Sequence, residues 1–186
     1  ALGFRACVWD ITGLGRFGGF RQQEYAMDAK SEIKYYVKPD GSYVVRAFTL
    51  SNISFRDKEA ATIHHPLQNE DACDEIGTEY DIQKNRVNGQ VVFFRREDKY
   101  PAFCPVRRGL SLVRRAVDLG QESHQPLCVY RDAKGKHYLT GKDITQYYRF
   151  VVKLIQPNIA AEELKLISSH SLRVTACVLL AEAGKE

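Results

Sequence analysis

Apolar positions recur at helical spacing through the second half of the chain. After Pro105, apolar residues at 106, 110, 113 and 117 predict a helix that ends near Gly120. Residues 141–156 predict another helix, which Pro157 ends. A short helical turn is expected within 157–167, and a last helix over 169–182 with Gly184 beyond it.

In the first half of the chain, a glycine-rich segment separates two stretches for which helices are predicted. The apolar stretch over residues 1–11 predicts a packed helix or its end, and residues 20–29 predict a helix. Between them we expect a turn, because the segment "TGLGRFGG" is rich in glycine.

Strand signals are short and scattered. Two β-branched and aromatic runs within 33–50 flank Pro39-Asp40-Gly41, which predicts a hairpin. Further strands are expected at "QVVFFRRE" (90–97) and "PLCVYRD" (126–132), whereas the polar residues 56–82 read as a loop with room for a short helix. Helices around a small antiparallel sheet define an α+β fold, and a chain of 186 residues fits one domain over 1–186.

Composition narrows the class of protein. No apolar run approaches the roughly 20 residues that cross a bilayer, so no membrane partner is expected. The five cysteines are scattered and none forms C-x-x-C, which favours free thiols inside a cell. Net charge is +4, but residues 81–115 hold nine basic and three acidic side chains. This clustering predicts a face that tolerates phosphates, or merely a solvated basic surface.

The start of the last helix carries His170 and Arg173, which share a helix face because they are three residues apart. With Ser168 or Ser169 as the N-cap, both would lie in the first turn, where free N–H groups and the helix dipole favour an anion. The pair therefore fits a phosphate clamp, although an ordinary surface pair has the same spacing.

A second arginine follows the glycine-rich segment. In "GFRQQEYA", Glu24 lies three residues after Arg21 and can brace it. Arg16 is a rival for the same role. We prefer Arg21, because only Arg21 has Glu at +3 and an apolar residue at +4.

Together, "GFRQQEY" and "HSLRVTACVLLAEAG" resemble the two motif boxes of the tyrosine recombinase (phage integrase) family, T-G-x-R-x-x-E-L and H-x-L-R-H-T-x-A-x-x-L-x-x-x-G. Thr175, Ala176 and Gly184 keep the second pattern, and Val174 replaces its second histidine. "YPAFCPVRRGLSLVRRA" looks more like a recombinase of a mobile element. The resemblance implies a mainly helical catalytic domain with a small antiparallel sheet.

The resemblance also implies a chemistry without metal or cofactor. A tyrosine hydroxyl attacks a DNA phosphodiester and forms a 3′-phosphotyrosyl link. Arg21 and Arg173 would clamp the non-bridging oxygens, His170 would donate a hydrogen bond or assist proton transfer, and Glu24 would support Arg21. The family's lysine, a general acid, falls in "DIQKNRVNGQVVFFRRE"; Lys84 is preferred, with Lys99 and Arg86 as rivals.

The family's third box and its nucleophilic tyrosine follow the second arginine. None of the ten tyrosines of this chain lies after Arg173, so we expect no nucleophile in the chain and no cleavage by it alone. The chain is thus expected to be a catalytic-domain fragment, truncated before the nucleophile segment.

The expected partner is double-stranded DNA, with self-association on it, in the nucleus of a eukaryote or the cytoplasm of a prokaryote. Weaker DNA contacts are expected at Arg86, Arg107, Arg108 and Lys142. The alternatives are a DNA-binding protein of similar fold that does not cleave, and a structural or interaction domain whose motif match is accidental.

Two other sites are not favoured by the sequence. His64 and His65 precede Asp71, Asp74 and Glu75, but adjacent residues rarely bind one metal ion together. "GLGRFGG" lacks the lysine and serine of a P-loop.

Overall fold

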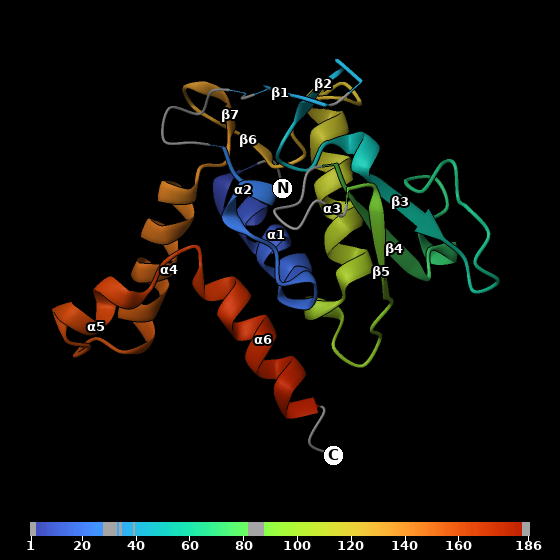
Figure 1. Cartoon of the computed structure of the whole chain (residues 1–186). Coiled ribbons are helices and arrows are strands. Elements are labelled where there is room, and N and C mark those ends of the chain that lie inside the picture. Colours follow the sequence, from blue (N-terminus) through green and yellow to red (C-terminus); the bar gives the residue numbers. More distant parts are fainter. Residues whose placement is uncertain (1–2, 28–32, 34, 39, 82–87, 184–186) are drawn as a thin grey trace.

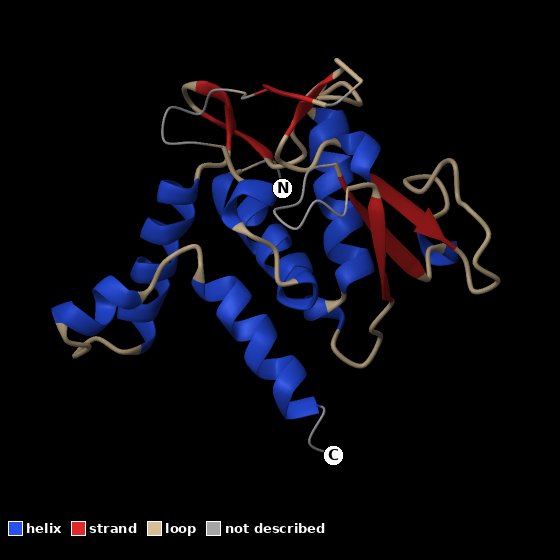
Figure 2. Ribbon diagram, viewed as in Figure 1, coloured by secondary structure: helices blue, strands red, loops and turns tan. Residues whose placement is uncertain are grey.

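The computed structural model describes residues 3–27, 33, 35–38, 40–81 and 88–183. Across these ranges the fold is α+β, as the sequence predicts: helices pack together with small antiparallel sheets. Figure 2 shows the helices filling the centre and one side, with the strands along the top and the other side.

The helices of the second half confirm the sequence prediction closely. Pro105 is the first residue of its helix, and Gly120 follows with a φ of 67°, the left-handed conformation that ends many helices. The next long helix ends at Ile155, before Pro157. The helices are α1 (Phe4–Gly18), α2 (Gln22–Tyr25), α3 (Pro105–Asp118), α4 (Gly141–Ile155), α5 (Ala161–Leu166) and α6 (Ser171–Ala183).

The described strands form one three-stranded sheet and two hairpins. The hairpin expected around Pro39-Asp40-Gly41 is present, although its strands have only three residues each. In the larger sheet, β4 lies between β3 and β5, and both pairings are antiparallel. The strands are β1 (Tyr35–Val37), β2 (Tyr43–Val45), β3 (Ile53–Arg56), β4 (Glu75–Tyr80), β5 (Gln90–Arg95), β6 (Val129–Asp132) and β7 (Gly135–Tyr138).

The loop expected over residues 56–82 was wrong at its C-terminal end, because β4 occupies 75–80. The glutamates of this segment hide its alternation: Ile76, Thr78 and Tyr80 are buried, while Glu75 and Glu79 are half-buried. Glu75 lies opposite Arg95 of β5, and its Oε1 accepts a hydrogen bond from Arg95 Nε at 3.3 Å. The strand β7 was likewise not expected from "GKHY".

The glycine-rich turn was also wrong, because α1 continues through Gly13 and Gly15 to Gly18. These two glycines allow close packing of helices. A Cβ on Gly13 would lie 2.6 Å from Cγ of Arg108 in α3, and one on Gly15 would lie 2.6 Å from Cδ2 of Leu172 in α6. Their intrinsic cost in a helix is offset by the close approach that they permit.

The helix expected over 20–29 is limited to the four residues of α2. After Tyr25 the backbone is extended at Ala26, and Met27 N donates to Leu139 O at 2.8 Å. The chain therefore leaves the helix to pair with the segment before α4.

α1 is the centre of the molecule, with α3 on one side and α6 on the other (Figure 1). α3 in turn packs against the three-stranded sheet, where Gly109 lies against Ile76 of β4. The interface of α1 with α3 contains a buried ion-pair network: Asp10 accepts from Arg108 Nη1 at 2.9 Å and also from Arg115. Asp10 and Arg115 are both almost fully buried.

The start of α6 docks on the segment that contains α2. The Tyr25 hydroxyl, which is buried, donates to the carbonyl of Ser169 at 2.9 Å. Along α6, Leu172 and Ala176 are buried against α1, whereas Leu179 is exposed. Gly184, expected to end this helix, lies outside the described residues. The position of α6 is therefore set mainly at its N-terminal end.

We expect Asp10→Ala to lower the free energy of unfolding by about 3–5 kcal/mol, because it removes the carboxylate that neutralises a buried arginine. Urea denaturation followed by the fluorescence of Trp9, the single tryptophan, measures this change. The control Glu162→Ala removes an exposed ion pair with Lys165 and should leave the midpoint unchanged. Equal midpoints for the wild type and Asp10→Ala would contradict the assigned role.

Tyr25→Phe should lower the free energy of unfolding by about 1–3 kcal/mol, because the buried carbonyl of Ser169 loses its donor. The same denaturation assay applies, with Tyr100→Phe as the control at an exposed tyrosine. A loss of the same size in both variants would show that the buried hydrogen bond is not its cause.

Candidate functional site

Arg21 is the residue that immediately precedes α2, and Glu24 in that helix holds it. The Glu24 carboxylate accepts hydrogen bonds from the Arg21 backbone N at 2.7 Å and from Arg21 Nη1 at 3.0 Å. Glu24 is buried, whereas a third of the Arg21 side chain is exposed. The carboxylate thus orients the guanidinium and leaves part of it open to a ligand.

His170 lies immediately before α6, not within its first turn as the sequence suggested. Its carbonyl accepts the first helical hydrogen bonds, from the backbone N of Arg173 at 3.1 Å and of Val174 at 3.3 Å. Ser169 is instead bound to neighbouring segments, since its carbonyl accepts from Tyr25 and its N donates to Thr145 Oγ1. The His170 side chain is exposed and Arg173 half-buried.

Gln22 is the point where the two motif boxes meet. Its Oε1 accepts a hydrogen bond from Ser169 Oγ at 2.5 Å, one residue before His170. Its amide also contacts Gly141, the first residue of α4, where an added Cβ would lie 1.9 Å from Gln22 Nε2. Gln22, which follows Arg21 in the chain, therefore contacts the N-terminal ends of both α4 and α6.

Both helix ends carry the partial positive charge of the helix dipole. Thr140 caps α4, since its Oγ1 accepts from the backbone N of Asp143 at 3.1 Å. The T-x-x-D pattern of this cap can be read from the sequence, but its position beside the N-terminus of α6 cannot.

Tyr80, at the end of β4, shows that Arg21 and Arg173 lie on the same side of the fold. Burial raises the pKa of the Tyr80 phenol well above its ordinary value, and the Glu24 carboxylate adds to this shift. Arg21 and Arg173 both oppose the shift electrostatically, so each guanidinium lies near the same hydroxyl. The sequence did not single out Tyr80; a tyrosine that is buried with a raised pKa is a poor nucleophile.

The rival Arg16 lies elsewhere. Its guanidinium stacks 4.9 Å from the ring centre of Phe103, and its side chain lines an apolar groove of about 430 Å³ between α1, α4 and α6. Glu24 pairs with Arg21, so the structure separates the two arginines that the sequence left as alternatives.

Of the three candidates for the family's lysine, only one lies within the described residues. Lys84 and Arg86 both lie outside the described residues. The remaining rival, Lys99, follows the end of β5 that pairs with Glu75, whereas Tyr80 pairs with Gln90 at the other end. Its Nζ lies 5.2 Å from the ring centre of Tyr100, far along the sheet from the arginine pair.

The other basic residues divide into two groups. Arg107 pairs with Asp98 at 3.6 Å, and Arg108 is held in the network of Asp10, so Arg108 serves the packing of α1 on α3. Lys142 is exposed in the first turn of α4, next to the glycine that contacts Gln22. Only Lys142 of these three is adjacent to the meeting point of the two boxes.

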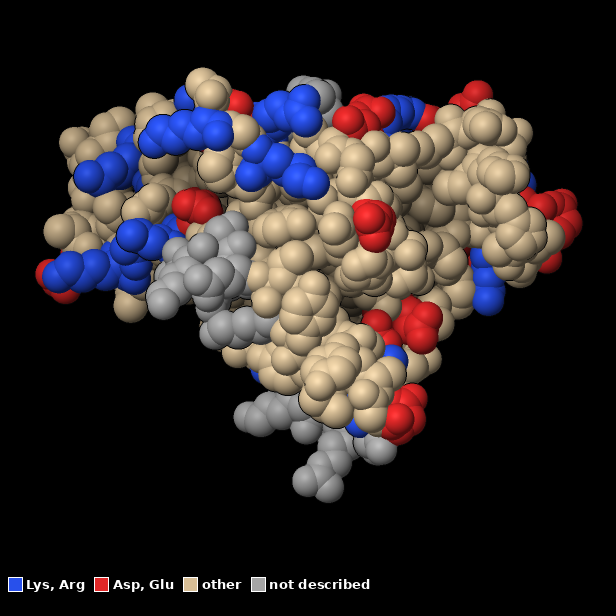
Figure 3. Space-filling model, turned by 90° about the horizontal axis from the view of Figure 1, so that it is seen from above, with Lys and Arg blue, Asp and Glu red and all other residues tan. Residues whose placement is uncertain are grey.

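Seen from above, Lys and Arg side chains gather on one part of the surface (Figure 3). The hairpin β6–β7 contributes Arg131, Lys134 and Lys136, which are all exposed. β7 leads into α4, whose first turn carries the exposed Lys142. We call Arg21, His170 and Arg173, with Lys142 beside them, the basic site.

Other binding features are limited within the described ranges. No group of three His, Cys, Asp or Glu side chains there is arranged to hold a metal ion, and His64 and His65 are exposed. No described helix is both long enough and apolar enough to cross a membrane.

Comparison of the chain with protein-family models, with curated proteins and with solved structures gave no match.

Proposed function

We propose that the chain is the catalytic domain of a site-specific DNA recombinase or integrase of the tyrosine recombinase type. Such an enzyme cleaves and rejoins DNA strands through a 3′-phosphotyrosyl intermediate. The main support is that Gln22, next to the braced Arg21, contacts both Ser169 at the start of α6 and Gly141 at the start of α4, which brings the two motif boxes together. Two arginines and two helix N-termini suit a group with several anionic oxygens.

In this proposal Arg21 and Arg173 bind the two non-bridging oxygens of the scissile phosphate. Glu24 holds Arg21 ready before the DNA arrives, so little reorganisation is needed when negative charge develops in the transition state. His170, exposed at the start of α6, can donate a hydrogen bond to the same group.

Two roles fall outside the described basic site. Lys84 stays the proposed general acid toward the 5′-oxygen leaving group. Tyr80 is not the proposed nucleophile, since its burial and raised pKa oppose formation of the phenolate. The nucleophile belongs instead to the segment that follows the second box in the family pattern.

The proposed partner is double-stranded DNA, on which copies of the protein assemble. The alternative is a DNA-binding protein with the same basic site that does not cleave. The two functions share phosphate binding and differ only in covalent chemistry, so they are tested separately.

We expect the chain to bind duplex DNA with an affinity that falls steeply as salt rises. Arg173→Ala should weaken binding about 10-fold or more and lower the salt dependence by about one unit of slope, because one phosphate contact is lost. Fluorescence anisotropy of a labelled duplex over a range of salt concentrations measures both quantities.

Arg95→Ala is the matched control. The Arg95 side chain is 85% exposed. Arg95 pairs with Glu75 at one end of the β4–β5 ladder, whereas Tyr80 is at the other end. Its loss should change the affinity less than about 2-fold, since it lies outside the basic site. If Arg95→Ala and Arg173→Ala reduced binding equally, a diffuse basic surface would explain the data better than the basic site.

Cleavage is tested on the natural gene product that carries this chain, using a nicked duplex that traps a covalent adduct. Wild-type protein should form an adduct that survives denaturing electrophoresis, and Arg173→Ala should reduce it by about 100-fold or more. DNA binding without any adduct on a verified target would support the non-cleaving alternative.

A further inference from the structure

One face of the hairpin β1–β2 exposes large apolar side chains to solvent. Residues directly opposite in the ladder share a face, so Tyr35, Val37, Tyr43 and Val45 lie together. Tyr35, Val37 and Tyr43 are 53%, 64% and 72% exposed, whereas Val45, opposite Tyr35, is buried. On the opposite face Tyr36 is half-buried, with the guanidinium of Arg46 stacked 5.5 Å from its ring centre. The exposed part of this face therefore presents two tyrosines and a valine to a ligand.

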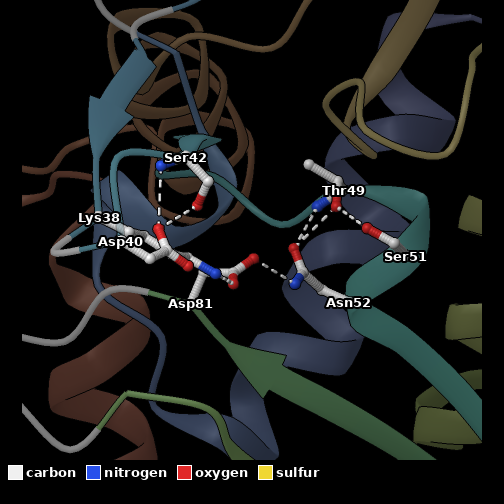
Figure 4. Close-up of polar contacts among 7 residues, drawn as sticks. All are labelled: Lys38, Asp40, Ser42, Thr49, Ser51, Asn52 and Asp81. Atoms are coloured by element: carbon white, nitrogen blue, oxygen red, sulfur yellow. Dashed lines mark hydrogen bonds and ion pairs between the residues drawn. The ribbon is translucent and has the colours of Figure 1, made fainter.

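The hairpin is joined directly to the strand that carries Tyr80. Lys38, which follows β1, donates from Nζ to Asp81 Oδ1 at 2.6 Å (Figure 4). Asp81 is the residue that follows Tyr80 in the chain. Its carboxylate also accepts a hydrogen bond from Asn52 Nδ2 at 2.7 Å, so it joins the hairpin to the end of β4. Val45 of the hairpin also packs with Met27, which pairs with Leu139 shortly before the N-terminus of α4. That N-terminus contacts Gln22, so the hairpin is a neighbour of the basic site.

The surroundings of the hairpin favour a polyanion. Val45 of β2 and Tyr138 of β7 pack in one small cluster, which places the two hairpins together. The second hairpin carries exposed Arg131, Lys134 and Lys136. An aromatic face next to a basic one suits DNA bases, whose backbone is anionic and whose rings stack on tyrosine.

The proposed reaction determines which bases are available. A strand that is cut and rejoined to a new partner must first leave its complement. Bases close to the scissile phosphate are then unpaired, and they need a surface on which to stack.

We propose that Tyr35, Val37 and Tyr43 form a platform that binds unpaired DNA bases beside the basic site. The platform rests on the proposed function, because it requires DNA at that site. It adds a ligand that the two motif boxes do not suggest: the faces of bases, bound without sequence preference.

The experiment compares two labelled DNA probes by fluorescence anisotropy: a fully paired duplex and the same duplex with a central bubble of unpaired bases. Wild-type protein should bind the bubble more tightly than the duplex. The double variant Tyr35→Ser/Tyr43→Ser should lose about 10-fold or more in affinity for the bubble, while its affinity for the duplex changes little.

Two controls accompany the double variant. Tyr100→Ser removes a tyrosine of similar exposure, 55%, which lies after the C-terminal end of β5. This variant should leave both affinities unchanged. Tyr35→Phe/Tyr43→Phe keeps the rings and should keep the preference for the bubble. Circular dichroism confirms that each variant folds.

The outcomes separate the platform from the proposed function. Unchanged bubble binding by the serine variant, or an equal loss on both probes, would overturn the platform and leave DNA binding by the basic site intact. Loss of the bubble preference in the phenylalanine variant would also overturn it. Absence of DNA binding by wild-type protein would overturn both proposals.

Discussion

The hydrogen bonds of Ser169 are the contacts on which the arrangement of the basic site depends. Its carbonyl accepts from Tyr25, its hydroxyl donates to Gln22, and its backbone N donates to Thr145. One residue thus connects the segment of Arg21, the helix α4 and the start of α6. Because these groups are buried or half-buried, breaking one leaves a polar atom without its partner, which costs more than an exposed hydrogen bond.

Close packing of α3 and α6 on α1 stabilises the same arrangement. Gly13 and Gly15 lack the Cβ atoms that would collide with Arg108 and Leu172, so α3 and α6 both approach α1 closely. The carboxylate of Asp10 lies in one of these interfaces, where it neutralises buried positive charge. Arginine therefore serves two purposes in this chain: Arg108 and Arg115 stabilise the core, whereas Arg21 and Arg173 remain open to a ligand.

The contrast between Arg16 and Arg21 shows what local sequence can decide. Glu24, three residues after Arg21, predicted that the guanidinium of Arg21, and not that of Arg16, is held by a carboxylate. A carboxylate in the first turn of a helix can reach back to the residue that precedes the helix. The strand β4 shows the opposite case. Its glutamates suggested a loop, yet pairing on both sides and burial of alternate side chains stabilise it as the central strand.

The sequence by itself determined the α+β class, the bounds of α3 and α4 and the hairpin β1–β2, because helical periodicity, caps and turn residues are local signals. It also singled out Arg21, Glu24, His170 and Arg173 as candidates, through their spacing and the resemblance of the two motif boxes. Only the tertiary structure decided that "TGLGRFG" is helical, that α6 begins at Ser171 and that Gln22, Gly141, Ser169 and Tyr80 adjoin the arginines. These features depend on contacts between residues far apart in the sequence, such as Gly15 with Leu172 and Gln22 with Ser169, and the energy of such contacts is absent from any local pattern.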